Sequence, residues 1–282
     1  MGLRTTPGRV PLYPAADAWG SLTVAGPLAR TVADAALLLS VMAGPDPRCP
    51  LSLDTPGHTF RAPLERDLRG LRVARAPDLG GRVPVEPAVR DVLLQQVSVW
   101  RDLGCRVEED CPDFGGADRV FRVLRAQSFR HALKPHLDAS PDALRSSIVW
   151  NIEEGARLTG DDLACVAAER TRLHLAAVRF FERYDVLLAP VSQVAPFPVE
   201  WEYPYVVDGQ PQHTYIDWMR SAYLVSVLGV PALSVPAGFT PDGLPVGLQI
   251  VGPPRADRAV LEVGAAYEAA TRYGRREPRL AS

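Results

Sequence analysis

The side chains that could do chemistry are scattered along this 282-residue chain and do not gather in motifs. The chain has five histidines, which are His58, His131, His136, His174 and His213. No Gly-x-Ser-x-Gly elbow occurs, so a Ser–His–Asp hydrolase of that type is not expected. His131 and His136 are five residues apart, which does not place both on one helical face, and metal binding by that pair is disfavoured. The four cysteines show no Cys-x-x-Cys or Cys/His spacing, which argues against a zinc site.

Lysine is the most restricted of the reactive residue types in the chain. There is a single lysine, Lys134, beside thirty arginines. It lies in the stretch His131-Ala-Leu-Lys-Pro-His136, which indicates a polar helix end followed by proline, and we interpret it as a solvated charge. A lysine acts as a base only where its surroundings lower its pKa, and arginine stays protonated and cannot replace a lysine in that role.

Composition places the chain among globular proteins and limits its partners. Hydrophobic residues make up 47% and charged residues 23%, and the net charge is −2. We therefore expect neither a nucleic-acid nor a membrane partner, because no basic surface is indicated and no apolar run approaches the ~20 residues of a membrane helix. The absence of a leader and of a disulfide pattern predicts a cytoplasmic protein.

The first part of the chain predicts a loop followed by a helix. The opening MGLRTTPGRVP is rich in Pro and Gly and indicates turns, with neither a strand nor a helix start. Leu28 to Ala43 predicts a helix that begins after Gly26-Pro27, ends at Gly44-Pro45 and contains an Arg30–Asp34 ion pair.

The rest of the chain alternates strand and helix patterns, as in an α/β protein. Strands from Leu71 and from Cys105 flank a helix that opens at Pro87, which is the βαβ pattern of a parallel sheet. Residues 117–184 are predicted to be mostly helical, with Thr159 as an N-cap. The further predictions are a strand over 185–190, a proline-rich surface excursion over 190–212, a helix over 215–228, two strands over 232–239 and 244–251 joined at 241–243, and a helix over 256–273.

Two long segments resemble the amidase signature family. GPLARTVADAALLLSVMAGPDPR (Gly26 to Arg48) is similar to the stretch that follows the catalytic core of these enzymes, and VPALSVPAGFTPDGLPVGLQIVGPP (Val230 to Pro254) is similar to their C-terminal strand pair. Between them, LRGLRVARAPD and FFERYDVLLAPV match weaker family landmarks in the same order. The resemblance implies an α/β fold with a mixed sheet flanked by helices, incomplete at its N-terminal side, so that residues 1–282 form a single incomplete amidase domain.

The resemblance also implies a chemistry whose catalytic groups the chain does not contain. Family members cleave amide C–N bonds with two serines and a buried neutral lysine, and a glycine-rich loop holds the oxyanion. Those parts lie upstream of the segment that GLRTTPGRVP resembles, and no Gly-Gly-Ser occurs in the chain. We therefore assign no catalytic residue. The chain is expected to be the C-terminal part of a hydrolase of a small carboxamide, from a truncated, split or misread gene, inactive by itself and without a cofactor.

A small group of residues is expected to contact the substrate. Aromatic and thioether side chains suit an apolar pocket wall, and several fall where the family carries variable substrate-facing residues. They are Tyr215, Trp218, Met219 and Tyr223, with Asp217 among them, and Trp150 is added as a further candidate. Trp19, before the first helix, is interpreted as a core residue in preference to one at the mouth of an active site.

Three alternatives follow for the protein as a whole. The true product is longer, or a separate N-terminal polypeptide completes the site in trans, or the chain is a non-catalytic binding or scaffold homologue. Without the upstream strands and helices, a sheet edge and an apolar face would be left open. The chain expressed alone is therefore expected to be poorly soluble or oligomeric.

Overall fold

The computed structural model describes residues 1–61 and 63–276. Within them, six strands form one mixed sheet in the order β1–β7–β8–β4–β2–β3. These strands are β1 (Gly2–Arg4), β2 (Arg72–Arg75), β3 (Arg106–Glu109), β4 (Val186–Pro190), β7 (Ala232–Phe239) and β8 (Pro245–Val251). Strand β2 pairs in parallel with β3 and β4, and the other pairs are antiparallel. Strands from both ends of the chain thus meet in one sheet.

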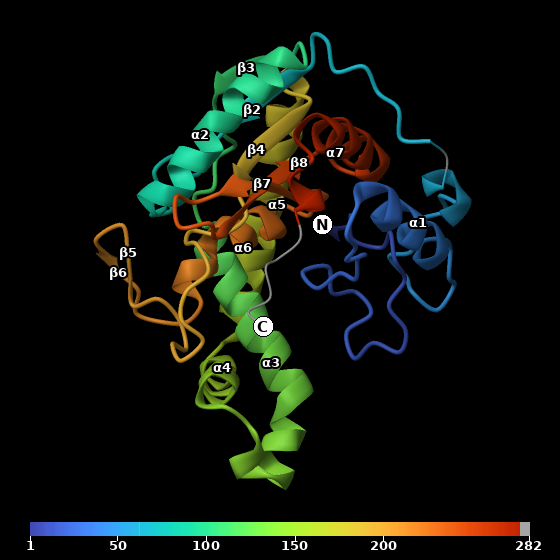
Figure 1. Cartoon of the computed structure of the whole chain (residues 1–282). Coiled ribbons are helices and arrows are strands. Elements are labelled where there is room, and N and C mark those ends of the chain that lie inside the picture. Colours follow the sequence, from blue (N-terminus) through green and yellow to red (C-terminus); the bar gives the residue numbers. More distant parts are fainter. Residues whose placement is uncertain (62, 277–282) are drawn as a thin grey trace, which may run out of the picture.

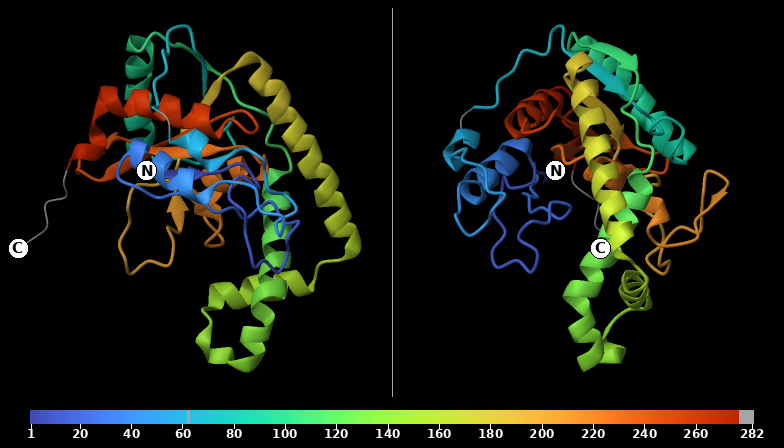
Figure 2. Two further views of the ribbon diagram at one scale, coloured as in Figure 1. Left: turned by 90° about the vertical axis from the view of Figure 1, so that its right-hand side faces the viewer. Right: turned by 180° about the vertical axis from the view of Figure 1, so that it is seen from behind.

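Helices flank this sheet, as the α/β prediction requires. They are α1 (Val32–Met42), α2 (Pro87–Asp102), α3 (Ala117–Ala139), α4 (Ser146–Ala156), α5 (Gly160–Arg183), α6 (Arg220–Val227) and α7 (Asp257–Thr271). Helices α2 and α7 contact each other and the strands β7 and β8 (Figure 1). Helix α5 crosses the molecule on the side seen from behind, and α3 and α4 extend away from the sheet at one end (Figure 2).

The βαβ unit and most later elements confirm the predictions from local pattern. Strands β2 and β3 are parallel and joined through α2, whose buried side chains include Val89 and Trp100. Thr159 caps α5 in a reciprocal pair with Asp162, and β7 and β8 form the expected hairpin. Within the described residues, no helix is long and apolar enough to cross a membrane.

The first helix is shorter than predicted. Helix α1 begins at Val32, because Thr31 is extended and its hydroxyl accepts a hydrogen bond from the Asp34 N–H at 3.0 Å. Arg30 therefore precedes the helix, and the expected pair with Asp34 inside the helix is wrong. Leu28 forms a bridge to Gly2 and is 80% exposed.

The opening segment is not only turns, and that prediction is wrong. Residues 2–4 form β1, which pairs with β7 on one side, while the Leu3 N–H donates to the Pro27 carbonyl at 3.0 Å on the other. Further along, Thr6 and Arg9 donate to the carboxylate of Asp257, which is fully buried at the start of α7. The partners of this segment are distant in sequence, so its local residue types did not reveal the strand.

Three further predictions about single positions have different outcomes. Helix α3 runs through Pro135 to Ala139, so the expected helix end at this proline is wrong. Lys134 pairs with Asp138 one turn later, and its side chain is 38% exposed, which agrees with a solvated charge. Trp19 is 73% exposed, so its interpretation as a core residue is wrong.

Candidate functional site

An apolar hollow lies where β4 ends and β8 begins. Its volume is about 370 Å³, and it is lined by Val89, residues 191, 192 and 194–197, Trp218 and residues 245–247. The Trp218 ring meets Phe197 edge-on, with centroids 5.3 Å apart. The polar side chain in the lining, Ser192, donates its hydroxyl to the carbonyl of Val194 at 2.8 Å. The hollow therefore suits an apolar or aryl group.

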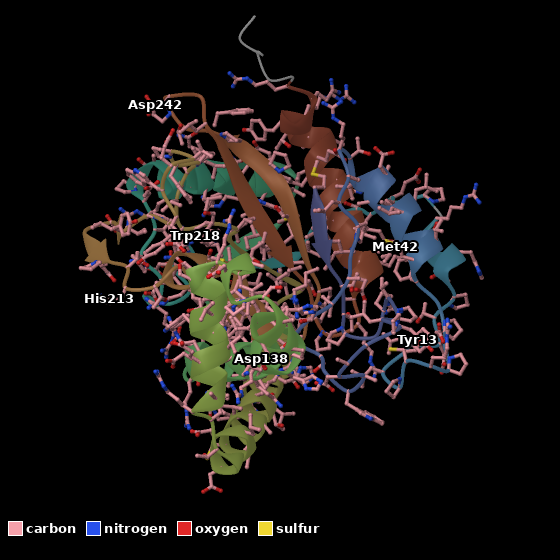
Figure 3. All side chains as sticks on the ribbon, turned by 90° about the horizontal axis from the view of Figure 1, so that it is seen from below. Tyr13, Met42, Asp138, His213, Trp218 and Asp242 are labelled. Carbon is pink, nitrogen blue, oxygen red and sulfur yellow. The ribbon has the colours of Figure 1, made fainter. Side chains whose placement is uncertain are left out.

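Buried hydrogen bonds fix the wall of this hollow. The side-chain amide of Gln249 on β8 donates to the carbonyls of Pro190 and Ser221, both at 2.8 Å. The Ser221 hydroxyl donates in turn to the carbonyl of Val191 at 3.0 Å. These bonds hold the chain after β4 against α6. Figure 3 shows Trp218 and His213 on the side of the molecule away from Tyr13 and Met42.

Tyr223 lies in a closed polar network and does not line the hollow. It is 3% exposed, stacks on Phe121 with centroids 4.1 Å apart, and donates its hydroxyl to Asp118 on α3. Burial first, and then the hydrogen bond to Asp118, raise the pKa of Tyr223. The side chain is therefore a neutral donor that joins α6 to α3.

Arg122 continues this network to Asp217, in the 3₁₀ turn Asp217–Met219. Its guanidinium pairs with Asp118 at 2.9 Å and with Asp217, which also accepts from the backbone N–H groups of His213 and Thr214 at 2.8 Å. Burial acts to raise the pKa of Asp217, but the hydrogen bonds from Thr214 and Arg122 outweigh it and lower that pKa. Arg220 pairs with Asp217 as well, at 3.0 Å.

Tyr215 and Trp150 lie together at the junction of α3 and α4. Their rings meet edge-on with centroids 6.2 Å apart, and both side chains are half-buried. The Tyr215 oxygen accepts hydrogen bonds from Arg125 at 2.9 Å and from Asn151 at 2.6 Å. Met219 ends the 3₁₀ turn and is half-buried against the core.

The five predicted substrate residues are thus divided among different surroundings. Trp218 lines the hollow, Tyr215 and Trp150 form an aromatic pair, Tyr223 belongs to the closed network, and Met219 packs against the core. The polar residues that organise these groups were missed from sequence; they are Asp118, Arg122, Arg125 and Asn151. The spacing of Asp118 and Arg122, four residues apart on a helix, was a usable signal for the first pair.

The comparisons with known proteins agree with this architecture. The chain belongs to the amidase family, whose model matches residues 1–261. It is 33% identical over 282 residues to an acylamidase of Rhodococcus erythropolis, covering 99% of this chain and 58% of that protein. It is also 31% identical over 264 residues to an amidase of Pseudomonas putida, covering 92% of this chain and 56% of that protein.

Solved structures show the same partial coverage. The crystal structure of a bacterial aryl acylamidase of the amidase signature family aligns with a TM-score of 0.85 and 26% identity. That alignment covers 97% of this chain and 58% of the other. The chain therefore spans just under three fifths of the length of these relatives.

Proposed function

We propose that these residues are the C-terminal part of an amide hydrolase that cleaves the C–N bond of a small carboxamide. Membership of the amidase family over residues 1–261 carries the proposal. Lys134 is half-exposed and paired with Asp138, which is not the environment of a buried neutral base. In this proposal the Ser–Ser–Lys chemistry comes from a segment outside the 282 residues, and residues 1–282 belong to a single amidase domain.

The role proposed for this chain is to form the substrate walls. The hollow at Trp218 is apolar and measures about 370 Å³, within the range of about 300–1,000 Å³ that is usual for small-molecule sites. It would take the apolar or aryl part of the amide. The names of two of the relatives, an acylamidase and an aryl acylamidase, are consistent with such a substrate.

The outer face of α1 supports completion by a further segment. Val32, Ala35 and Leu39 are buried on one side of this helix. On the other side Leu37 is 50%, Leu38 42% and Val41 79% exposed. Apart from Asp34 in its first turn, this outer face carries apolar side chains, and an apolar helix face is normally buried against another element. Helix α1 lies close to the N-terminus and the sheet edge at β1 (Figure 1), and we infer that the completing segment packs there.

The proposal is tested by expressing the chain alone and together with whatever the DNA upstream of Met1 encodes. Release of aniline from acetanilide, and of ammonia from benzamide, is measured for both. We expect no turnover by the chain alone and turnover by the completed enzyme. Lys134→Ala in the completed enzyme is expected to leave kcat unchanged. Turnover by the purified chain alone, or loss of activity in Lys134→Ala, would overturn the assignment.

A surface substitution tests the place of docking. Replacing Leu38 and Val41 by Gln removes apolar surface from the outer face of α1. If the completing segment packs there, the double variant binds that segment more weakly when the two parts are produced as separate polypeptides. The control is a double variant in which the exposed Leu94 on α2 and Leu175 on α5 are likewise replaced by Gln. Equal loss of binding in both double variants would contradict docking at α1.

A further inference from the structure

The hydroxyl group of Tyr215 has no acceptor for its proton among residues 1–61 and 63–276. Its oxygen accepts hydrogen bonds from Arg125, through Nη2 at 2.9 Å and Nε at 3.3 Å, and from Asn151 Nδ2 at 2.6 Å. A guanidinium group has no acceptor atom, so Tyr215 cannot donate to Arg125. Its own O–H therefore points to an acceptor other than Arg125.

The orientation of Asn151 excludes the remaining neighbour as that acceptor. Asn151 is 1% exposed, and its Nδ2 also donates to the carbonyl of Ser147 at 2.7 Å. Turning the amide over would place its oxygen against that carbonyl, two acceptors at hydrogen-bond distance. The nitrogen therefore faces Tyr215. Among the described residues, the Tyr215 O–H donates to no acceptor.

Arg125 itself carries a charge that the described part of the chain does not balance. None of the ion pairs formed by residues 1–61 and 63–276 includes it. Its guanidinium instead lies 4.2 Å from the ring centroid of Phe129, 5.8 Å from that of Phe121 and 5.6 Å from that of Tyr215. Such stacking holds the group in place and leaves its other N–H donors free.

The neighbouring arginines Arg122 and Arg220, unlike Arg125, are paired with carboxylates of the described residues. Arg122, one turn earlier on α3, is shared between Asp118 and Asp217, and Arg220 reaches the same two carboxylates. Those two carboxylates are thus already matched by two guanidinium groups, and Arg125 pairs with neither. The side chains of Arg125, Tyr215 and Trp150 are half-buried, so part of each is exposed to solvent.

We propose that Arg125, Tyr215 and Asn151 form a binding site for the carboxylate group of the ligand. One carboxylate oxygen accepts from the Tyr215 O–H and the other from the free N–H groups of Arg125, an arrangement of charge-assisted hydrogen bonds. Asn151 holds the Tyr215 oxygen in place. The Trp150 ring beside Tyr215 offers an apolar surface to the body of the ligand. Resting on the proposed function, this defines the substrate as an amide that carries a carboxylate apart from the scissile bond.

The test is a binding measurement on the whole chain with two probes that differ only in the charged group. N-benzoylglycine carries the carboxylate, and N-benzoylglycinamide replaces it with a neutral amide. Isothermal titration calorimetry is expected to show the acid binding about 10-fold more tightly, as charge-assisted hydrogen bonds predict. Arg125→Gln is expected to abolish the preference, and Tyr215→Phe to reduce it while keeping the ring. Arg145→Gln, at an exposed position before α4, is the control for general charge and is expected to preserve it.

The outcomes separate this inference from the proposed function. Equal affinity for the two probes in the parent chain, no binding of either, or a preference that survives Arg125→Gln would each overturn it. Circular dichroism melts of Tyr215→Phe and Arg125→Gln establish that the fold persists. Because the assay needs no turnover, a carboxylate preference in a chain that never completes an active amidase would sustain the site and refute only the reaction.

Discussion

Two clusters of polar residues, each built around an arginine of α3, differ in how many of their charges and hydrogen-bond donors are paired. The first joins Asp118, Arg122, Asp217 and Tyr223, and each charge in it meets an opposite charge. The second, one turn further along, joins Arg125 to Tyr215 and Asn151 and retains donors that have no acceptor in the described part of the chain. A closed network contributes to the fold, and its charges are paired with one another. The open one gives up part of its potential stabilisation and keeps the capacity to bind.

The largest expected effect comes from breaking the closed network at its centre. Arg122→Ala leaves Asp118 and Asp217 without their main cation, and Asp217 is 5% exposed. Removing one partner of a buried ion pair costs about 3–5 kcal/mol, and because Arg122 is partly exposed we expect about 3 kcal/mol. The free energy of unfolding in urea measures this loss.

The matched change in the open cluster is Arg125→Ala. Arg125 has no carboxylate partner in the described part of the chain, so its removal leaves no anion unpaired and costs about 1 kcal/mol of lost stacking. The quantity that tests the comparison is the difference in free energy of unfolding between Arg122→Ala and Arg125→Ala. If both lose the same free energy of unfolding, the two clusters do not differ in how completely their charges are paired.

A second pair of variants tests the tyrosines themselves. Tyr223→Phe removes a buried donor to the Asp118 carboxylate and is expected to cost about 2 kcal/mol, typical of a hydrogen bond to a charged group. Tyr215→Phe removes an acceptor whose donors keep other contacts, because Arg125 is partly exposed and the buried Asn151 amide still donates to the Ser147 carbonyl, so a loss below about 1 kcal/mol is expected. Thermal and urea unfolding of the two variants measure these losses of stability. A larger loss in Tyr215→Phe than in Tyr223→Phe would contradict the expected order.

The contrast between the clusters also shows what a sequence can reveal. Helices, the βαβ unit and the β7–β8 hairpin follow from local periodicity and turn residues, so they were predictable. Strand β1 was not, because its three residues are held by β7, about 230 positions away. Trp218 was a candidate because of its aromatic character and its place in the resembled family, and it lines the hollow. Arg125 is one of thirty arginines, and Asn151 gains its role from Tyr215, 64 residues away, so neither carried a local signal.

The smallest effect expected is the dependence of stability on pH in the closed network. The pKa of Asp217 is lowered in the folded state, so its carboxylate stabilises the fold above its unfolded pKa of about 3.9. That contribution is lost as the pH falls through the lower, folded pKa. Asp217→Asn cannot be protonated in this range. We therefore expect the parent to be more stable than Asp217→Asn at pH 7, with the difference shrinking below pH ~4.

The difference between parent and variant is the quantity to measure, because other carboxylates with lowered pKa values, such as Asp113 and Asp185, titrate in both proteins and cancel. Urea unfolding between pH 3 and pH 7 gives it directly. Arg125→Gln is the matched control from the open cluster, in which none of the described carboxylates takes part, and its difference from the parent is expected to stay constant over the same range. The opposite result is a difference in free energy of unfolding between the parent and Asp217→Asn that is as large at pH 3 as at pH 7. It would mean that the charge of Asp217 does not stabilise the network, and that only its hydrogen-bonding geometry distinguishes the two clusters.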